Sequence, residues 1–97
     1  MGKYYRAYVL CRLARIGTEW EVVEAVLKLK PKEGEDWKVT YATPVYGMWD
    51  LLIELSYTHQ SQVDTVVTFV RNNPEFRDKI EETTTLLGSR QNYPLDD

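Results

Sequence analysis

The sequence has few residues of the kinds that build metal centres and covalent catalytic sites. Cys11 is its one cysteine and His59 its one histidine. A lone cysteine excludes an intramolecular disulfide and fits a reducing cytoplasm. A histidine without a second histidine, a cysteine cluster or paired carboxylates nearby argues against a transition-metal site. We therefore expect no catalytic residue, no metal and no cofactor, with Cys11 as an inert buried thiol and His59 at the surface.

Clustered glycines, net positive charge and long apolar runs are also missing. The glycines in the body of the chain stand singly, so the sequence has no glycine-rich loop for phosphates. The formal net charge of −3 repels phosphates and argues against a nucleic-acid surface or an anionic membrane surface. No apolar run is long enough for a signal-peptide core or a membrane span. These absences predict a cytoplasmic protein that binds neither nucleic acid nor membranes directly.

The strongest pattern that is present is a β-hairpin in residues 39–57. Alternating side chains predict its two strands, one set being Val39, Tyr41, Thr43 and Val45 and the other Leu51, Ile53, Leu55 and Tyr57. In the turn between them, 46–50, Gly47 takes a positive φ without steric cost. Pro44 has no N–H for a ladder, so the first strand should lie at a sheet edge or carry a bulge. Asp50 either fastens the turn by hydrogen bonds or points outward to a ligand amine, and the sequence leaves both open.

A strand and a helix are predicted before the hairpin. Residues 6–13 alternate as a strand does, and the side expected to face the helices carries Ala7, Val9, Cys11 and Leu13. Thr18 and Glu21 have the spacing of a capping box for a helix that runs to about Leu29. The charged segment 30–36 then forms a loop.

A second helix and a last strand are predicted after the hairpin. Ser61 is expected to cap the helix, whose apolar positions are Val63, Val66, Val67 and Val70. Residues 72–74 stop it, and the β-branched stretch 80–87 predicts the strand. We expect one domain over residues 1–90 and a polar tail over residues 91–97.

The element order βαββαβ predicts an α+β, ferredoxin-like fold, with a four-stranded antiparallel sheet and two helices on one face. Right-handed crossovers place strands one and three in the centre. The other face would expose apolar side chains, either Tyr8, Leu10 and Leu52 or, in the opposite phase, Ile53 and Leu55. Soluble monomers tolerate about a few hundred Å² of such surface. A homodimer or higher homo-oligomer, associated like a dimeric α/β barrel, is therefore expected.

Three segments carry a family resemblance, namely AYVLCR at 7–12, VYGMWDLLIE at 45–54 and ETTTLL at 82–87. Their most specific parts are the Gly-x-x-Asp of Gly47 and Asp50 and the Thr-x-Thr of Thr83 and Thr85. In this order, on these strands, they resemble the effector-binding (RAM) domain of the Lrp/AsnC family of transcription regulators, over residues 6–90.

The resemblance implies a dimer whose open sheet faces pack together, higher assembly of dimers, and small effectors, often amino acids, bound near the Gly-x-x-Asp turn. It departs from the family in two ways. The helix-turn-helix DNA-binding half is missing, so the sequence resembles a stand-alone form, expected to act in transcriptional or metabolic regulation through partner proteins, for example in hetero-oligomers with a full-length Lrp/AsnC-type regulator. The loop 30–36 is also longer and more charged than the tight turn usual there.

On this interpretation the ligand site comprises Tyr46, Gly47, Met48, Trp49 and Asp50, with Thr83 and Thr85 opposite. Asp50 would accept the ammonium of an amino acid, and the amides after Gly47 would bind its carboxylate. Trp49 and Met48 would wall the side-chain pocket. The alternative is that Asp50 only fastens its own turn and that both walls belong to a dimer–dimer contact.

Other functions remain open because the fold alone does not decide activity. A cofactor-free, ferredoxin-like monooxygenase would place a pocket inside the monomer. An RNA-binding module would need exposed aromatic and basic residues on strands one and three, where this sequence is largely aliphatic. A purely structural oligomer would seal apolar cavities between subunits. Four aromatic residues cluster near the hairpin and could serve either as core and subunit contacts or as a ligand cage. They are Trp37, Tyr41, Tyr46 and Trp49.

Overall fold

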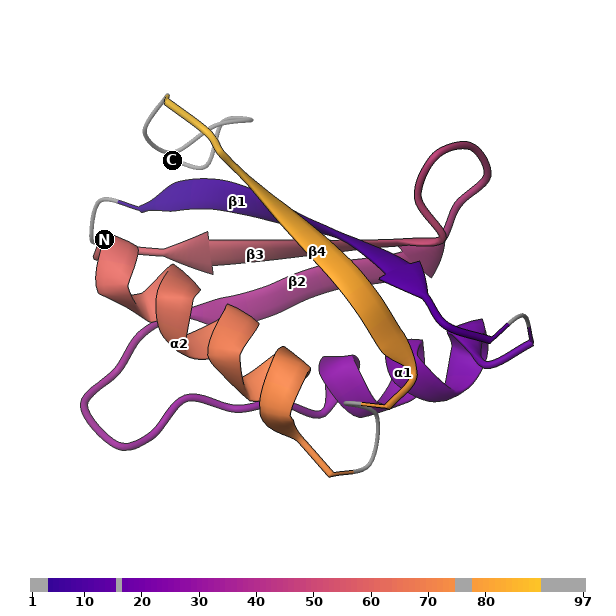
Figure 1. The fold of residues 1–97 in the computed structure, drawn as a ribbon. Helices are drawn as coiled ribbons and strands as arrows, with labels where there is room; N and C mark the ends of the chain where they lie inside the picture. Colours follow the sequence, from indigo (N-terminus) through magenta and orange to yellow (C-terminus); the bar gives the residue numbers. More distant parts are fainter. Residues whose placement is uncertain (1–3, 16, 75–77, 90–97) are drawn as a thin grey trace.

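The computed structural model describes residues 4–15, 17–74 and 78–89. Its elements are β1 (Tyr5–Leu13), α1 (Glu19–Leu27), β2 (Lys38–Pro44), β3 (Leu51–Tyr57), α2 (Gln60–Asn72) and β4 (Ile80–Leu87) (Figure 1). The strands form one antiparallel sheet in the order β2-β3-β1-β4. The predicted ferredoxin-like α+β fold is confirmed, with β1 and β3 in the centre. The predicted tail, 91–97, lies outside the described residues.

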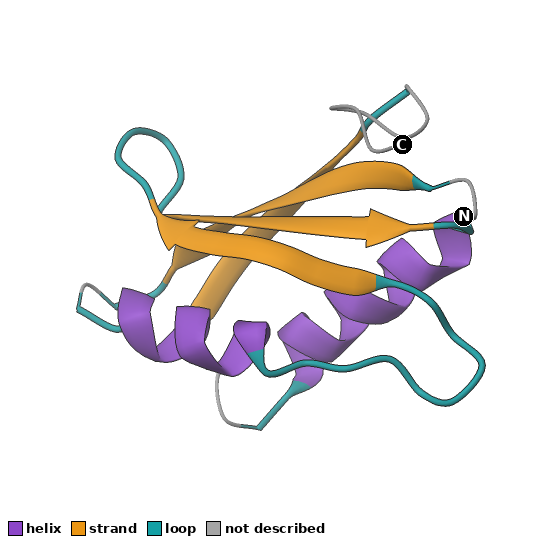
Figure 2. Cartoon of the chain, turned by 180° about the vertical axis from the view of Figure 1, so that it is seen from behind, coloured by secondary structure: helices purple, strands orange, loops and turns teal. Residues whose placement is uncertain are grey.

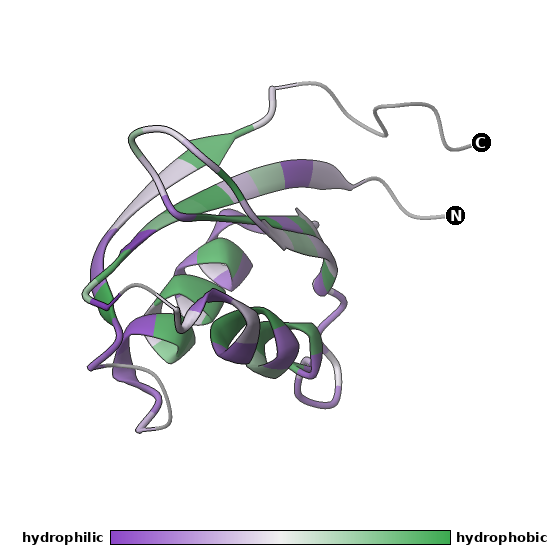
Figure 3. Cartoon of the chain, turned by 90° about the vertical axis from the view of Figure 1, so that its right-hand side faces the viewer, coloured by the Kyte–Doolittle hydropathy of each residue, from purple (hydrophilic) through white to green (hydrophobic). Residues whose placement is uncertain are grey.

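Both helices cover one face of the sheet, and no described element covers the other (Figures 1 and 2). Apolar residues recur along the strands as well as on the helices (Figure 3). The uncovered side, which we call the open face, carries Arg6, Tyr8, Leu10, Arg12, Tyr41, Thr43, Leu52, Glu54, Glu82, Thr84 and Leu86, as the strand register shows. No helix in the described ranges has the length and apolar character needed to cross a membrane.

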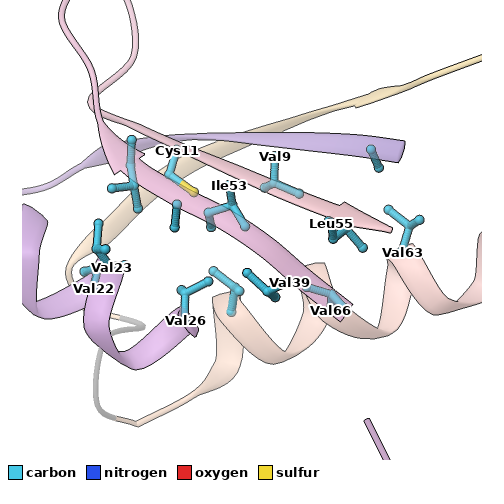
Figure 4. Close-up of a cluster of buried hydrophobic side chains, with 14 of the residues drawn as sticks. Val9, Cys11, Val22, Val23, Val26, Val39, Ile53, Leu55, Val63 and Val66 are labelled. Atoms are coloured by element: carbon cyan, nitrogen blue, oxygen red, sulfur yellow. The ribbon is translucent and has the colours of Figure 1, made fainter. Parts of the chain in front are cut away.

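The core lies between the sheet and the helices, as strand alternation predicts. Its fully buried side chains include Ala7, Val9, Cys11, Val22, Val26, Leu51, Ile53, Leu55 and Val70, several of which are drawn in Figure 4. Burial of Ile53 and Leu55 decides the phase of β3. Leu52 therefore lies on the open face, beside Leu10 in the register.

The edge strand β2 departs from simple alternation. Its register against β3 shifts between Val39 and Tyr41, as at a β-bulge. Val39 and Ala42 are both buried, whereas Tyr41 is exposed. The prediction that Tyr41 shares a face with Val39 is therefore wrong, because the bulge turns the side chains after it to the other side. The edge position that Pro44 predicts is confirmed.

The start of α1 is held differently from the predicted capping box. Thr18 is the N-cap residue, but its side chain makes no capping bond and instead donates to the carbonyl oxygen of Arg15 at 3.0 Å. The carboxylate that folds back is that of Glu19, whose Oε1 accepts from the N–H of Gly17 at 2.6 Å. The helix ends at Leu27, earlier than expected.

The start of α2 also differs from the prediction. His59, which is exposed as expected, is the N-cap residue in place of Ser61. The reason is Gln62, whose side-chain oxygen accepts from the backbone N–H groups of Thr58 at 2.8 Å and His59 at 3.2 Å. These bonds satisfy amides at the helix start, so α2 begins before Ser61.

Candidate functional site

A cleft of about 500 Å³ lies at the end of the sheet where the β2–β3 turn meets the start of α1. Its lining residues are Leu13, Arg15, Glu19, Trp20, Thr43, Pro44, Val45, Tyr46 and Asp50. They come from the end of β1, the first turn of α1, and the end of the hairpin. The volume is in the range of small-molecule sites, about 300–1,000 Å³.

Asp50 joins the hairpin turn to the end of β1. The turn is closed by the N–H of Val45, which donates to the carbonyl oxygen of Asp50 at 3.0 Å. The N–H of Asp50 donates to the carbonyl oxygen of Cys11 at 2.9 Å, and its Oδ2 accepts from the N–H of Leu13, also at 2.9 Å. The half-buried carboxylate is thus fixed in the cleft wall, with capacity left for further donors.

The tip of the turn lies against Arg12 of the open face. Arg12 Nε and Nη2 donate to the carbonyl oxygen of Met48 at 3.3 and 3.2 Å. The guanidinium carbon also lies 5.0 Å from the centre of the Trp49 ring, a cation–π distance. In Figures 1 and 2 the turn rises from the sheet on the side away from the helices.

The structure therefore separates the five turn residues predicted for the ligand site. Tyr46 and Asp50 line the cleft. Gly47, with φ of 124°, forms the bend, and Met48 is exposed. Trp49 packs on the open-face side, away from the cleft lining.

The two predicted threonines lie elsewhere in the sheet. Thr83 and Thr85 pair with Cys11 and Val9 across the β1–β4 ladder, and directly paired residues point to the same side of a sheet. Both threonines therefore face the helices, where Arg71 Nη1 donates to Thr83 Oγ1 at 3.2 Å. They do not line the cleft, because β1 and β3 lie between β4 and β2, the first strand of the hairpin. Their part in a ligand site stays a prediction.

Charged and aromatic residues of the β1–α1 connection and of the first turn of α1 complete the cleft. Arg15 is exposed, and its guanidinium makes no hydrogen bond or ion pair with a described residue. Trp20 is 65% exposed and supplies a flat apolar wall. The sequence analysis missed Arg15, Glu19 and Trp20. The topology contained the signal, because β1 runs antiparallel to β3 and so ends beside the start of β3, at the turn.

Cys11 is fully buried, as predicted. Burial raises the pKa of its thiol to about 12, so the thiolate needed of a nucleophile is absent at neutral pH. Within the described ranges, no group of three or more histidine, cysteine, aspartate or glutamate side chains is arranged to hold a metal ion.

No protein-family model and no curated protein matches the sequence. Among solved structures the chain is similar to FFRP-DM1, with 26% identity and a TM-score of 0.61 over 87% of this chain and 97% of that one. It is similar to an AsnC family transcriptional regulator from Agrobacterium tumefaciens, with 18% identity and a TM-score of 0.68 over 92% of this chain and 52% of that one. It is also similar to a transcriptional regulator from Neisseria meningitidis in complex with L-Met, with 13% identity and a TM-score of 0.60 over 89% of this chain and 50% of that one. The chain thus shares its fold with AsnC family regulators and related proteins, and spans about half the length of these two regulators.

Proposed function

We propose that this chain is an effector-binding and oligomerisation domain of the Lrp/AsnC type, and that its effector is an amino acid bound in the cleft. The observation that carries the proposal is that one small cleft brings together the Arg15 guanidinium, which pairs with no residue in the described ranges, and the fixed carboxylate of Asp50.

The charges of the cleft match those of a free amino acid. A guanidinium binds a carboxylate through two parallel N–H donors, so Arg15 is suited to the effector's carboxylate. Asp50 accepts hydrogen bonds from an ammonium group. Trp20 and Pro44 give the effector's side chain apolar surface to contact. The Neisseria relative, which is a complex with L-Met, supports this ligand class.

The oligomerisation part of the proposal is based on the open face. Its centre is apolar, with Tyr8, Leu10, Leu52 and Leu86 in neighbouring register positions. An ion pair lies toward each end, Arg6–Glu54 at 3.0 Å and Arg12–Glu82 at 2.9 Å. Such a surface, with an apolar centre and both charges at each end, can pair with itself about a two-fold axis. A second copy is therefore the proposed occupant, and a related regulator with the same face could take its place in a hetero-oligomer.

The proposed regulatory role follows from these two surfaces. An effector that binds one assembly state better than another shifts the balance between them. Occupancy of the cleft, beside the turn, would in this way alter which copies or partner proteins assemble. Regulation would then act through partners rather than through chemistry at the cleft.

A thermal-shift screen of the twenty amino acids tests the ligand. A ligand that binds only the folded state raises the melting temperature, by roughly 10 °C or more at about 100 times its dissociation constant. Arg15→Gln and Asp50→Asn should each abolish the shift. Asp50→Asn removes the charge but keeps an oxygen that can accept from Leu13. Lys28→Gln, at an exposed cation outside the cleft lining, is the control and should retain the shift.

Two results would contradict the proposed site. One is a shift that both cleft variants retain in full, which would place the ligand elsewhere. The other is the absence of any shift at millimolar amino acid, which would leave a purely structural oligomerisation module.

A small enzyme is the second candidate, because the cleft lies within a single chain, as expected for a cofactor-free monooxygenase. The described cleft residues include no histidine and no cysteine. One oxygen of Glu19 and one of Asp50 already accept backbone N–H groups. Turnover of an aromatic substrate that is lost in Asp50→Asn would favour the enzyme over the effector-binding domain.

A further inference from the structure

Arg12 is the residue at which the hairpin turn and the open face meet. Its side chain contacts the turn through the Met48 carbonyl oxygen and the Trp49 ring. Its Nη1 donates to Glu82 Oε1 at 2.9 Å, which joins the same guanidinium to β4. One side chain therefore joins three parts of the fold that are far apart in the sequence.

Three consecutive residues of β1 hold the whole turn. The backbones of Cys11 and Leu13 bind Asp50 at the base of the turn. The side chain of Arg12, which lies between them on the opposite face, binds the tip at Met48. The base of the turn borders the cleft, whereas the tip lies on the open-face side.

We infer that Arg12 is a positioning residue that links the open face to the cleft, holding the turn so that Tyr46 and Asp50 keep their places in the cleft wall. The link to an effector rests on the proposed function, but the hold on the turn does not. Because the Arg12 and Glu82 side chains are 36% and 52% exposed, a second copy covering the open face would remove water from this pair and strengthen it. Assembly would then tighten the turn.

Arginine suits this position for geometric reasons. Its planar group donates in several fixed directions at once and can lie flat over an aromatic ring. Here it donates to Met48 and Glu82 while it covers Trp49. A lysine keeps the charge but has one compact donor group. It can therefore retain the ion pair with Glu82 and still lose the contacts with Met48 and Trp49 in the turn.

The test is amide hydrogen exchange at Val45 and Asp50, whose N–H groups are both hydrogen-bonded in the ligand-free protein. In Arg12→Lys we expect both to exchange roughly tenfold faster, the factor expected for losing one charge-assisted hydrogen bond. Glu82→Gln keeps the contact with Met48 and should give a smaller increase. Arg6→Lys is the matched control, because Arg6 lies on the same strand and face in an ion pair at the other end, and it should leave both rates unchanged.

Protein concentration supplies the second readout. In the wild type, both amides should exchange more slowly at protein concentrations where sedimentation shows assembly. In Arg12→Lys, the exchange rates should depend less on protein concentration. Equal rates in Arg12→Lys and wild type, with both folded by circular dichroism, would overturn the positioning role. Exchange rates that stay constant while sedimentation shows assembly would overturn the link to the open face. A protein that stays monomeric refutes the proposed oligomerisation, while the comparison of Arg12→Lys with Arg6→Lys still decides the role of Arg12 in the turn.

Discussion

Cys11 has a thiol that is fully enclosed by the core, and burial raises its pKa to about 12. The unfolded chain releases this proton near pH 9, whereas the folded state keeps it. The stability from the buried neutral thiol is therefore fully present below about pH 9 and is lost as the pH rises toward 12, by up to about 1.4 kcal/mol per pH unit. Denaturant unfolding at about pH 8 and pH 10.5 should show a steeper fall for wild type than for Cys11→Ala. Other ionisable groups are the same in both proteins and so contribute equally to both falls. Equal falls in the free energy of unfolding would therefore contradict the effect of Cys11.

Single residues were predictable where local alternation decides their surroundings. The buried positions of Ala7, Val9 and Cys11 follow from their period of two along one strand. The side of the sheet on which Tyr41 lies could not be predicted, because a bulge turns the side chains after it to the other face without a consistent sequence signal. The bond between Asp50 and Leu13 joins residues 37 positions apart, and no short-range pattern encodes it.

The start of α2 depends on one buried side chain, Gln62, which is 7% exposed. It accepts from the N–H groups of Thr58 and His59 and donates to Asp36 Oδ1 at 2.8 Å. Gln62→Leu should lower the free energy of unfolding by about 2 kcal/mol, because two helix-start amides lose their acceptor. Urea unfolding measures this. Gln60→Leu, at an exposed position in the same first turn, is the control, and an equal loss there would show that the effect is not due to capping.

Whole elements were easier to predict than their ends. Six elements in the right order follow from periodicity, but the N-cap of α2 is His59 and not Ser61, because the helix start depends on hydrogen bonds of Gln62. The cleft shows the same division. Its hairpin side was expected from Asp50, whereas Arg15 and Trp20 belong to it because two connections meet in space.

We expect the open face to decide how the whole molecule assembles in solution. Leu10 lies near its centre, and Leu27 is 49% exposed on α1, on the other side of the fold. Light scattering at micromolar concentration should give a dimer or larger for the wild type and a monomer for Leu10→Lys, because a charge is costly to bury in an apolar interface. Leu27→Lys should leave the assembly unchanged. A monomeric wild type, or a Leu10→Lys variant that assembles as well as the wild type, would contradict the proposed interface.

The net charge leads to a second prediction for the whole molecule, which concerns binding to duplex DNA. With a formal charge of −3, the chain lacks the excess of lysine and arginine that releases counterions from duplex DNA. We expect no retarded band in a gel shift with duplex DNA at low salt, where electrostatic binding is strongest. A band that disappears as salt is added would show that the positive residues are grouped more effectively than their number suggests.

The strand order also has a consequence for how the chain is made. β1, the first of the four described strands in chain order, lies in the middle of the sheet, and its partners are β3 on one side and β4 on the other. Cys11 pairs with Leu51 and with Thr83 across these ladders. During translation, β1 must therefore wait for almost the whole domain to emerge before both of its edges are paired. Until then it remains a strand with an unsatisfied edge, so a ribosome-bound chaperone has its longest opportunity at the N-terminal strand of this fold.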